Sequence, residues 1–220
     1  MRVLIIYLLI LSTSALAQNK SGNNWVFGGP FATQAVFVDT SRPAMIGKYA
    51  NPYTYYIHGH STISDSATGK LLFSCNGMIL YDSNCVMMEN GDSLVPNRAY
   101  THNPFPNGML TQNSLILPKG SNGLYYVFVV SVTDSLYNAV WVTQLGSERA
   151  PFNILMYHIV DINANNGLGK VISKNNVLLS GKEMHKIGMM ACRHANGRDW
   201  WLLKQGQYDT NQVIRFLVTP

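Results

Sequence analysis

Three residue types that can form a nucleophilic catalytic site lie close together near the C-terminal end of the chain. In CRHANGRDWWLLKQG, which runs from Cys192 to Gly206, Cys192, His194 and Asp199 provide a thiol nucleophile, a base and a group to orient the base. The spacing argues against this chemistry, because Cys192 and His194 fall on one short strand and turn, whereas the members of a working triad converge from separate elements. We therefore predict a strand cysteine followed by a solvent-facing hairpin turn, and no catalytic residues.

A second candidate is a metal site at the sequence HGH. His58 and His60 lie two residues apart and so share one face of any strand. Two imidazoles placed in this way can bind zinc or copper, with His102 or His185 as a third ligand. A site needs three or four ligands, and the sequence shows two locally. We therefore predict a polar strand edge or loop, and neither a metal nor another cofactor.

Two further polar stretches are interpreted as turns. ISDSATG (63–69) is similar to the Asp-containing hairpin turns of sialidase propellers, which brace the fold, and it lacks the acidic spacing of an EF-hand calcium loop. VDINANNGLGK (160–170) has glycines like those of a phosphate-binding loop, but such a loop opens a helix and this one runs into a strand. A hairpin loop is the better interpretation of the second stretch.

The elements that must position these residues are predicted to be β-strands. Gly, Asn and Pro interrupt every 3.6-residue period, so no amphipathic helix is predicted. Short runs of β-branched and aromatic residues recur between Asn- and Gly-rich turns, which indicates an all-β fold. The runs are KLLFSC, MILYD, NSLIL, LYYVFVVSV, AVWVTQL, NILMYHIVDI, NVLLSG, WWLL and VIRFLV.

One hairpin bears on the pairing of the three cysteines. In FSCNGMIL the Asn-Gly pair fits a two-residue type I′ turn, which sets Cys75 opposite Met78. Cys85 lies well beyond Met78, so a disulfide between Cys75 and Cys85 requires the chain to fold back sharply. With Cys192 the number of cysteines is odd, so at least one thiol is unpaired or pairs with another molecule.

Three segments repeat one pattern of short strand, Gly-containing turn and stronger strand. They are STISDSATGKLLFS (61–74), SLILPKGSNGLYYVF (114–128) and MMACRHANGRDWWLL (189–203). A further strand follows each segment. A repeat of this kind predicts a β-propeller-like (WD40-like) fold with blades of four-stranded antiparallel sheets, about three of them in this chain. A β-sandwich with Greek-key connections is the alternative.

Aromatic residues are expected mostly at core or half-buried strand positions, with some available to line a carbohydrate or peptide surface at a propeller face. They are Trp25, Tyr55, Tyr56, Tyr125, Tyr126, Trp141, Trp200 and Trp201.

The first residues are predicted to be an export signal. Arg2 supplies the positive charge, VLIIYLLIL the apolar core and ALA (15–17) the cleavage site, with cleavage near Ala17. We assign residues 1–17 to the signal peptide and residues 18–220 to one domain. No apolar run reaches the about 20 residues that span a bilayer, so no membrane span is predicted. The expected location is extracellular or on the outer cell surface, with the periplasm as the alternative.

The charge pattern argues against a nucleic-acid partner. The net charge is +5 and only 12% of the residues are charged. The lysines are scattered along the chain, without the clustered, aromatic-lined stripe of a nucleic-acid-binding surface. We interpret them as solvated surface charge.

The chain resembles the N-terminal propeller-like region of large secreted Bacteroidota proteins, which commonly carry a C-terminal sorting domain of the type IX secretion or gliding-motility-associated kind. The resemblance rests on NNWVFG, STISDSATGKLLFSCNGMILYDSNCVMMENG, LTQNSLILPKGSNGLYYVFVV, MYHIVDINANNGLGKVISKN, RHANGRDWWLL and FLVTP, in this order. These motifs are structural, and the family brings no catalytic residues to carry over.

Members of that family continue with more blades and the sorting domain, whereas nothing in this sequence resembles the sorting domain. About three blades cannot close a propeller, which takes four to eight. We therefore expect either a piece of a longer protein or a second chain that supplies the missing blades. Open blade edges favour self-association.

The sequence thus predicts a non-enzymatic, exported binding or display module whose ligand is a protein or a carbohydrate. One alternative is a secreted glycosidase-like hydrolase on a propeller scaffold, which needs two carboxylates about 5 to 10 Å apart. The other alternative is a truncated fragment without an independent function.

Overall fold

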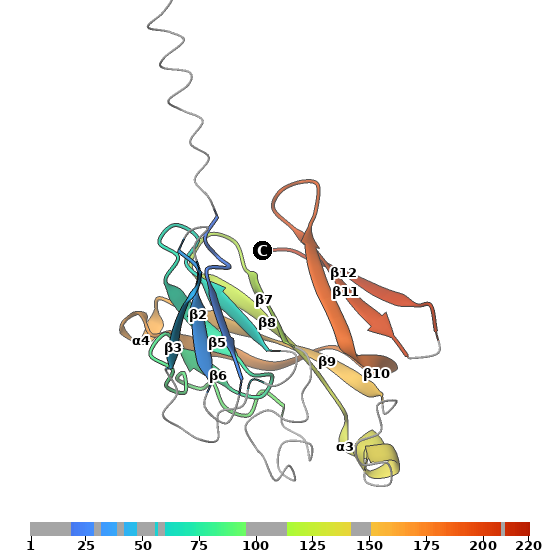
Figure 1. Cartoon of the computed structure of the whole chain (residues 1–220). Coiled ribbons are helices and arrows are strands. Elements are labelled where there is room, and N and C mark those ends of the chain that lie inside the picture. The colour runs from blue at the N-terminus through green and yellow to red at the C-terminus, as the bar shows by residue number, and fades with distance from the viewer. Residues whose placement is uncertain are drawn as a thin grey trace, which may run out of the picture.

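The structure, a computed structural model, describes residues 19–28, 32–38, 42–47, 56, 60–95, 114–141, 151–207 and 210–220. Over these residues the fold is all-β, as predicted (Figure 1). The helical segments of this part of the chain are short: α3 (Asp134–Leu136), η1 (Tyr137–Trp141) and α4 (Ala164–Gly167). The predicted signal peptide lies outside the described residues.

The strands form three sheets in which all pairings between strands are antiparallel. The first sheet contains β1 (Asn24–Phe27), β2 (Thr33–Val36) and β3 (Ala44–Gly47). The second contains β4 (Ser61–Ser64), β5 (Leu71–Cys75) and β6 (Leu80–Asp82). The third contains β7 (Ser114–Pro118), β8 (Leu124–Ser131), β9 (Phe152–Asp161), β10 (Lys170–Arg193), β11 (Trp200–Gly206) and β12 (Val213–Val218) in sequential order.

The 24-residue strand β10 changes its partner at Met184. Met184 pairs with Phe152 of β9 and with Gly206 of β11; β10 pairs with β9 before this residue and with β11 after it. The register shifts on both sides of Met184, where Gly181 and Gly188 have positive φ angles of 79° and 82°. Such irregularities bend a strand and increase its twist. The six-stranded sheet is therefore divided into β7–β9 with the first half of β10, and the second half of β10 with β11 and β12.

A buried lysine braces this bend. Lys204 of β11 is fully buried, and its Nζ donates a hydrogen bond to the backbone carbonyl of His185, one of the residues where the β10–β11 register shifts. A carbonyl that leaves the strand ladder needs another donor when it is buried. Burial lowers the pKa of Lys204 to about 8.

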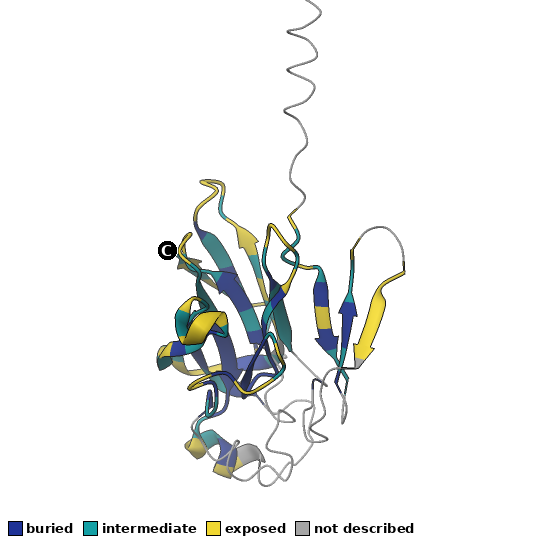
Figure 2. Cartoon of the chain, turned by 90° about the vertical axis from the view of Figure 1, so that its left-hand side faces the viewer, coloured by how far each residue is buried: buried dark blue, intermediate teal, exposed yellow. Residues whose placement is uncertain are grey.

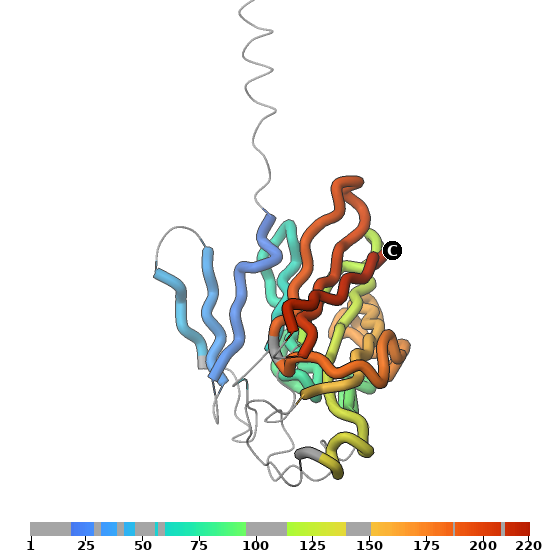
Figure 3. The backbone as a smooth tube through the Cα atoms, turned by 90° about the vertical axis from the view of Figure 1, so that its right-hand side faces the viewer, coloured from blue at the N-terminus to red at the C-terminus, as the bar shows by residue number. Residues whose placement is uncertain are grey.

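The strands can thus be grouped into four antiparallel units, each packed on the next. Unit 1 is β1–β3, unit 2 is β4–β6, unit 3 is β7–β9 with the first half of β10, and unit 4 is the second half of β10 with β11 and β12. The first strands of consecutive units lie side by side, β1 against β4, β4 against β7 and β7 against β10. The chain passes through the units in sequence order (Figure 3).

Three apolar cores fill the spaces between consecutive units. Between units 1 and 2, Val26 packs with Leu71 and Met78. Between units 2 and 3, Phe73 and Leu80 pack with Val129 and other valines. The third core, between units 3 and 4, contains Phe128 and Leu155 on one side and Met184 and Leu202 on the other. Each unit therefore buries an apolar face against a neighbouring unit.

The repeated hairpin pattern predicted from the sequence is confirmed. Its three copies are the β4–β5, β7–β8 and β10–β11 hairpins. Gly69, Gly123 and Gly197 occupy the same place before the second strand, with φ angles of 75°, 73° and 70°. A left-handed backbone is required at each turn, and glycine adopts it without a steric penalty.

The predicted four-stranded blades do not occur as separate sheets, because the described strands form sheets of three, six and three. The nearest equivalent is unit 3, where four consecutive strand segments pair in sequence order before β10 bends away. Units 2 and 4 contain three strands each among the described residues, and unit 1 adds a unit that the three-copy repeat did not reveal.

The predicted two-residue turn after Cys75 is wrong. Cys75 pairs with Leu80, not Met78, so the loop has four residues. The side chain of Asn76 accepts hydrogen bonds from the backbone N–H groups of Met78 (3.0 Å) and Ile79 (2.8 Å), which closes the wider loop. Asn side chains stabilise turns in this way, and the wider loop buries the side chain of Met78 in the core between units 1 and 2.

The predicted strand AVWVTQL is wrong over residues 139–141, which lie in η1; the rest of this run lies outside the described residues. The segment begins with a helix cap, because the side chain of Thr133 accepts a hydrogen bond from Leu136 N and its carbonyl accepts one from Tyr137 N. Asp134 adds a negative charge to the first turn. Both features favour a helical start over a strand.

We predict that Gly123→Ala destabilises the protein more than Gly197→Ala. Both residues have left-handed backbones, so each substitution should lower the free energy of unfolding by about 1 kcal/mol. A Cβ atom at Gly197 meets nothing within 4 Å, whereas one at Gly123 would lie 2.5 Å from Asn163 Nδ2, which donates a hydrogen bond to Asn122 O. Losing that bond should cost about another 1 kcal/mol. Denaturant unfolding measures both values, and equal losses would contradict the prediction.

Candidate functional site

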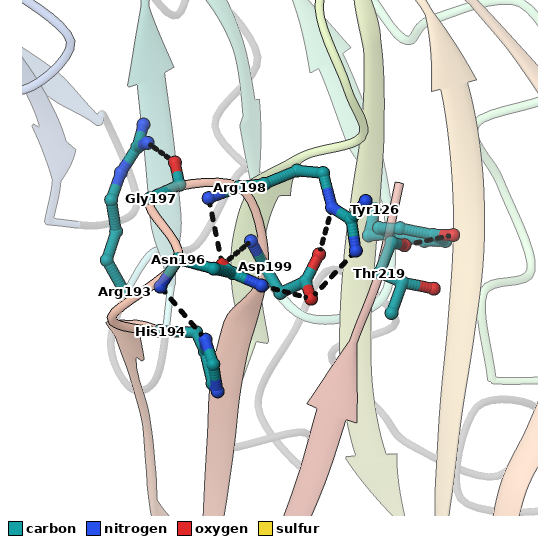
Figure 4. A network of polar contacts seen from close by, with 8 residues as sticks. All are labelled: Tyr126, Arg193, His194, Asn196, Gly197, Arg198, Asp199 and Thr219. Atoms are coloured by element: carbon teal, nitrogen blue, oxygen red, sulfur yellow. Dashed lines mark hydrogen bonds and ion pairs between the residues drawn. The ribbon is translucent and has the colours of Figure 1, made fainter.

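The stretch from Cys192 to Gly206 is a hairpin between β10 and β11, as predicted (Figure 4). The backbone closes the turn through hydrogen bonds from His194 N to Asp199 O and from Gly197 N to His194 O, both 2.9 Å. The side chain of Asn196 accepts from Arg198 N and Asp199 N at 3.0 Å, which holds the turn from within.

The residues of a thiol triad are not arranged for catalysis. The carboxylate of Asp199 accepts hydrogen bonds from Arg198 Nε and Asn196 Nδ2, both 2.7 Å, and Arg198 above all keeps the pKa of this carboxyl low. His194 Nδ1 accepts from Asn196 N at 3.1 Å, so this nitrogen does not donate to the carboxylate. Cys192 is exposed and pairs with Trp201 in the strand ladder. Hydrogen bonding assigns Asp199 to the turn and not to an imidazole.

The proposed metal ligands are not brought together among the residues that the structure describes. His58 and His102 lie outside those residues. The ring of His60 makes an edge contact with Tyr56, whereas His185 is buried at the bend of β10. In the described ranges no group of three His, Cys, Asp or Glu side chains is placed to hold a metal ion.

The other two polar stretches are turns, as predicted. In the β4–β5 turn, Asp65 Oδ1 accepts hydrogen bonds from Thr68 N (2.6 Å), Thr68 Oγ1 (2.7 Å) and Ala67 N (3.2 Å). The bonds from Thr68 lower the pKa of Asp65. The stretch that ends at Lys170 joins the paired strands β9 and β10, with Asn165 and Asn166 at φ angles of 50° and 55°. Asn tolerates this left-handed backbone better than most residues.

Units 2, 3 and 4 and the segment before β1 contribute to one cleft, which we call the turn cleft. It has a volume of about 620 Å³ and lies beside the turns of the β4–β5, β7–β8 and β10–β11 hairpins. Its walls include Asn19 and Ser21 before β1, Asp65 of unit 2, Tyr125 of unit 3, and Arg193 and Trp200 of unit 4. A concave space with a few convergent polar groups and aromatic rings is the usual form of a small-molecule site.

The segment before β1 is held in the cleft wall by unit 2. Ser64 N donates to Ser21 O at 2.9 Å, and Lys20 N donates to Ser66 O at 3.1 Å. The side chain of Asn19 accepts from Ser21 N at 3.0 Å. These bonds hold amide and hydroxyl groups of the N-terminal segment in the wall of the cleft that Asp65 also lines.

Part of the cleft wall is aromatic. The ring of Tyr125 packs edge-on against Phe73 with ring centroids 5.5 Å apart. Partial burial, with a smaller contribution from the charge of Asp65, raises the pKa of Tyr125, so its hydroxyl stays protonated and can donate. The guanidinium of Arg193 lies 4.9 Å from the ring centroid of Trp200 and donates to Gly197 O at 2.7 Å. The cleft therefore offers a ring surface, a cation, a carboxylate and neutral hydroxyls.

Sequence reasoning placed Tyr125 and Trp200 among the strand aromatics, some of which were expected to line a ligand surface. It did not identify which ones, nor did it link Asp65 to them. These residues are distant in sequence and belong to different units. The available signal was the hairpin repeat, because equivalent turns of packed units lie at one end of the fold.

A second cavity, of about 490 Å³, lies between units 1 and 2. Its walls include Lys20, Asn24, Gln34, Thr68 and Lys70. The Asn24 side chain is already committed, because its Nδ2 donates to Ser64 Oγ at 2.9 Å and to Gly69 O at 2.7 Å. We therefore favour the turn cleft as the functional site.

Comparisons with protein-family models, with curated proteins and with solved structures found no match. Among the described residues, no helix has both the length and the apolar character needed to cross a membrane.

We predict that alkylating reagents modify Cys192 well before Cys75 in a dilute solution of the folded protein. Cys192 is exposed, whereas Cys75 is fully buried and burial raises its pKa to about 11. Because the thiolate is the reactive form, Cys75 should react only on unfolding. Mass-spectrometric mapping of the modified peptides over time measures this order, and equal rates at the two thiols would contradict it.

A buried histidine should make stability depend on pH. His158 is fully buried in β9, its Nδ1 accepts from Asn175 N at 3.1 Å, and burial lowers its pKa from 6.5 to about 3. His158 therefore becomes protonated below about pH 6.5 in the unfolded chain, but only below about pH 3 in the folded chain. Its contribution to the free energy of unfolding falls as the pH falls between these two values. Between pH 7.5 and pH 5 we expect a loss of about 2 kcal/mol.

Unfolding of His158→Asn, in which the amide oxygen can replace Nδ1 as acceptor, should lack this loss. His194→Asn is the matched control and should keep the loss. The Nδ1 atom of His194, like that of His158, accepts a hydrogen bond from a backbone N–H, here that of Asn196, but it lies in a surface turn. An unchanged pH dependence in His158→Asn would contradict the assignment.

Proposed function

We propose that this protein is an exported, non-enzymatic binding module that holds a neutral oligosaccharide in the turn cleft. The observation that carries the proposal is the convergence of Asp65, Tyr125 and Trp200 from three units on one cleft. Asp65 stabilises its own turn, and Tyr125 and Trp200 pack on neighbouring side chains. These local roles do not require the three side chains to line one cavity.

The chemistry of the cleft suits a ligand rich in hydroxyl groups. Sugar hydroxyls donate to a carboxylate such as Asp65 and accept from the hydroxyl of Tyr125 or the guanidinium of Arg193. The apolar C–H face of a sugar ring packs on an aromatic ring such as Trp200, and a few placed polar groups then fix its orientation. A strongly anionic ligand is disfavoured because the carboxylate of Asp65 is held in its charged form by Thr68.

The four units are proposed to be blades of an incomplete propeller. Propeller blades are antiparallel sheets packed face to face around an axis, with their first strands innermost. The adjacency of β1, β4, β7 and β10 and the three cores between consecutive units support this arrangement. Propeller ligands bind where loops of several blades meet on one side of the ring, and the turn cleft has this position relative to the hairpins.

Binding without catalysis is supported by the composition of the cleft. Among the described residues of its wall, Asp65 is the one carboxylate, whereas a glycosidase needs two. Asp65 is also engaged by Thr68, which lowers its pKa and makes it a poor general acid. No observation specifically favours the hydrolase.

Export and a place outside the cell or on its surface are proposed from the N-terminal charge, apolar core and cleavage site. The resemblance to secreted Bacteroidota proteins of the sorting-domain kind points in the same direction and remains part of the proposal.

Screening the protein against a panel of neutral oligosaccharides, followed by calorimetric titration of those that bind, tests the function. We expect Arg193→Ala and Trp200→Leu to weaken binding about tenfold or more, which corresponds to about 1.4 kcal/mol. Arg215→Ala is the matched control, because Arg215 lies 4.6 Å from the ring centroid of Trp201 in the same kind of cation–π pair, but its residues are not in the cleft wall.

Thermal unfolding of each variant excludes loss of the fold as the cause. Equal weakening by Arg215→Ala would place the ligand elsewhere, and no binding to any neutral oligosaccharide would refute the ligand class. Release of reducing sugar by the wild-type protein would refute the non-enzymatic assignment.

A further inference from the structure

The sheet of unit 4 has two faces with different environments. One face, which includes Leu202, Ile214 and Phe216, packs in the core against unit 3. Side chains alternate along strands, so the neighbouring positions form the opposite face. We call this the C-terminal end face, and its residues are Met190, Cys192, Trp201, Leu203, Gln205, Val213, Arg215 and Leu217.

Apart from Gln205 and Arg215, the C-terminal end face is apolar, and it is open to solvent. Met190 and Val213 are each 63% exposed and Leu217 is 49% exposed. Trp201 and Leu203 lie between them in the strand ladder. A contiguous exposed apolar surface of this kind marks an interaction site.

Unit 1 has a similar face at the other end of the stack. Val26 points into the core with unit 2, so Trp25 points away from it and shares the outer face with Ala35 and Met45. We call this the N-terminal end face. Trp25 is 58% exposed and packs on Phe37 with ring centroids 5.1 Å apart, and Met45 is 57% exposed. Figure 2 shows the exposed strand β3 at the margin of the molecule.

The two end faces continue the packing that already holds the units together. Every junction inside the chain joins an apolar face of one unit to an apolar face of the next. Among the described units, unit 1 packs on unit 2 alone and unit 4 on unit 3 alone, so one face of each has no such partner. The C-terminal end face is therefore expected to pack on an apolar sheet face such as the N-terminal end face of unit 1.

We infer that the C-terminal end face of one molecule docks on the N-terminal end face of a second copy, and the reverse, in a closed two-fold dimer. Two copies bring eight units together, which lies within the four to eight blades of closed propellers. Contacts between unlike faces form a closed ring when the rotation between copies completes a circle. This inference uses the arrangement of the units and does not depend on the ligand of the turn cleft.

The expected contact area favours the closed dimer over a single contact. The three strands of unit 1 have four residues each, and at about 3.3 Å per residue and about 4.8 Å between strands they form a face of about 200 Å². One contact limited by this face buries about 400 Å² over both partners, far below the about 1,200 Å² of a stable interface. A closed dimer makes the contact twice and buries about 800 Å², the size of a weak interface that dissociates on dilution.

Light scattering and sedimentation of the purified chain test the inference. We expect twice the mass of one chain at about 100 µM, with dissociation on dilution. Val213→Glu on one end face and Met45→Glu on the other should each weaken association about 100-fold or more, because each buries unpaired charges at both contacts. Val86→Glu is the matched control, since Val86 is 61% exposed in the segment after β6 and belongs to neither end face.

The reactivity of Cys192 supplies a second readout that does not require a variant. This thiol lies on the C-terminal end face, so its alkylation should slow as the protein concentration rises, whereas alkylation of the half-buried Cys85 in unit 2 should not. A wild-type chain that stays monomeric at about 100 µM would overturn the inference. Association that Val213→Glu and Met45→Glu leave intact would overturn it as well, because a surface other than the end faces would then be responsible.

Discussion

The structure depends on the packing of each small antiparallel sheet against the next. An isolated two-stranded hairpin is at best marginally stable in water, and three strands need a buried hydrophobic face; units 1, 2 and 4 have three strands each among the described residues. Each of the three cores contains side chains from two units, so the stability of a unit comes from its neighbours. Architectures of repeated units have this property in general: a repeat is stable in the array and marginal outside it.

The same packing creates the functional candidate. Face-to-face stacking places the first strands of the units side by side and brings the hairpins that follow them to one end of the fold. The turns themselves are made by local interactions, such as the bonds from Thr68 to Asp65 and from Asn196 to Asp199. Because local bonds hold the turns rigid, their outer groups are available to a ligand with little loss of conformational freedom on binding, which favours affinity.

The bend of β10 allows one continuous strand to serve two units. Gly181 and Gly188 provide the backbone freedom, and Lys204 satisfies a carbonyl that the ladder releases. Burying an ammonium group is costly, and the lowered pKa of Lys204 expresses that cost. At the junction between units 3 and 4, the hydrogen bond from Lys204 to the His185 carbonyl thus offsets part of the cost of burying the lysine.

Features that depend on interactions between neighbouring residues could be predicted from the amino-acid sequence. Strand-forming runs such as VIRFLV matched β12 from Val213 to Val218, and the glycines at 69, 123 and 197 adopt the left-handed backbone that their turns require. Local patterns failed where a packing interaction chose between two turns, as for Asn76, whose wider loop buries Met78, and where a Thr133 cap began a helical segment. That Asp65, Tyr125 and Trp200 share one cleft could not be predicted from local patterns, because their proximity results from apolar packing between units that are distant in sequence. Periodicity and turn chemistry report the conformation of a few neighbouring residues, whereas that packing depends on the shapes of complete sheets.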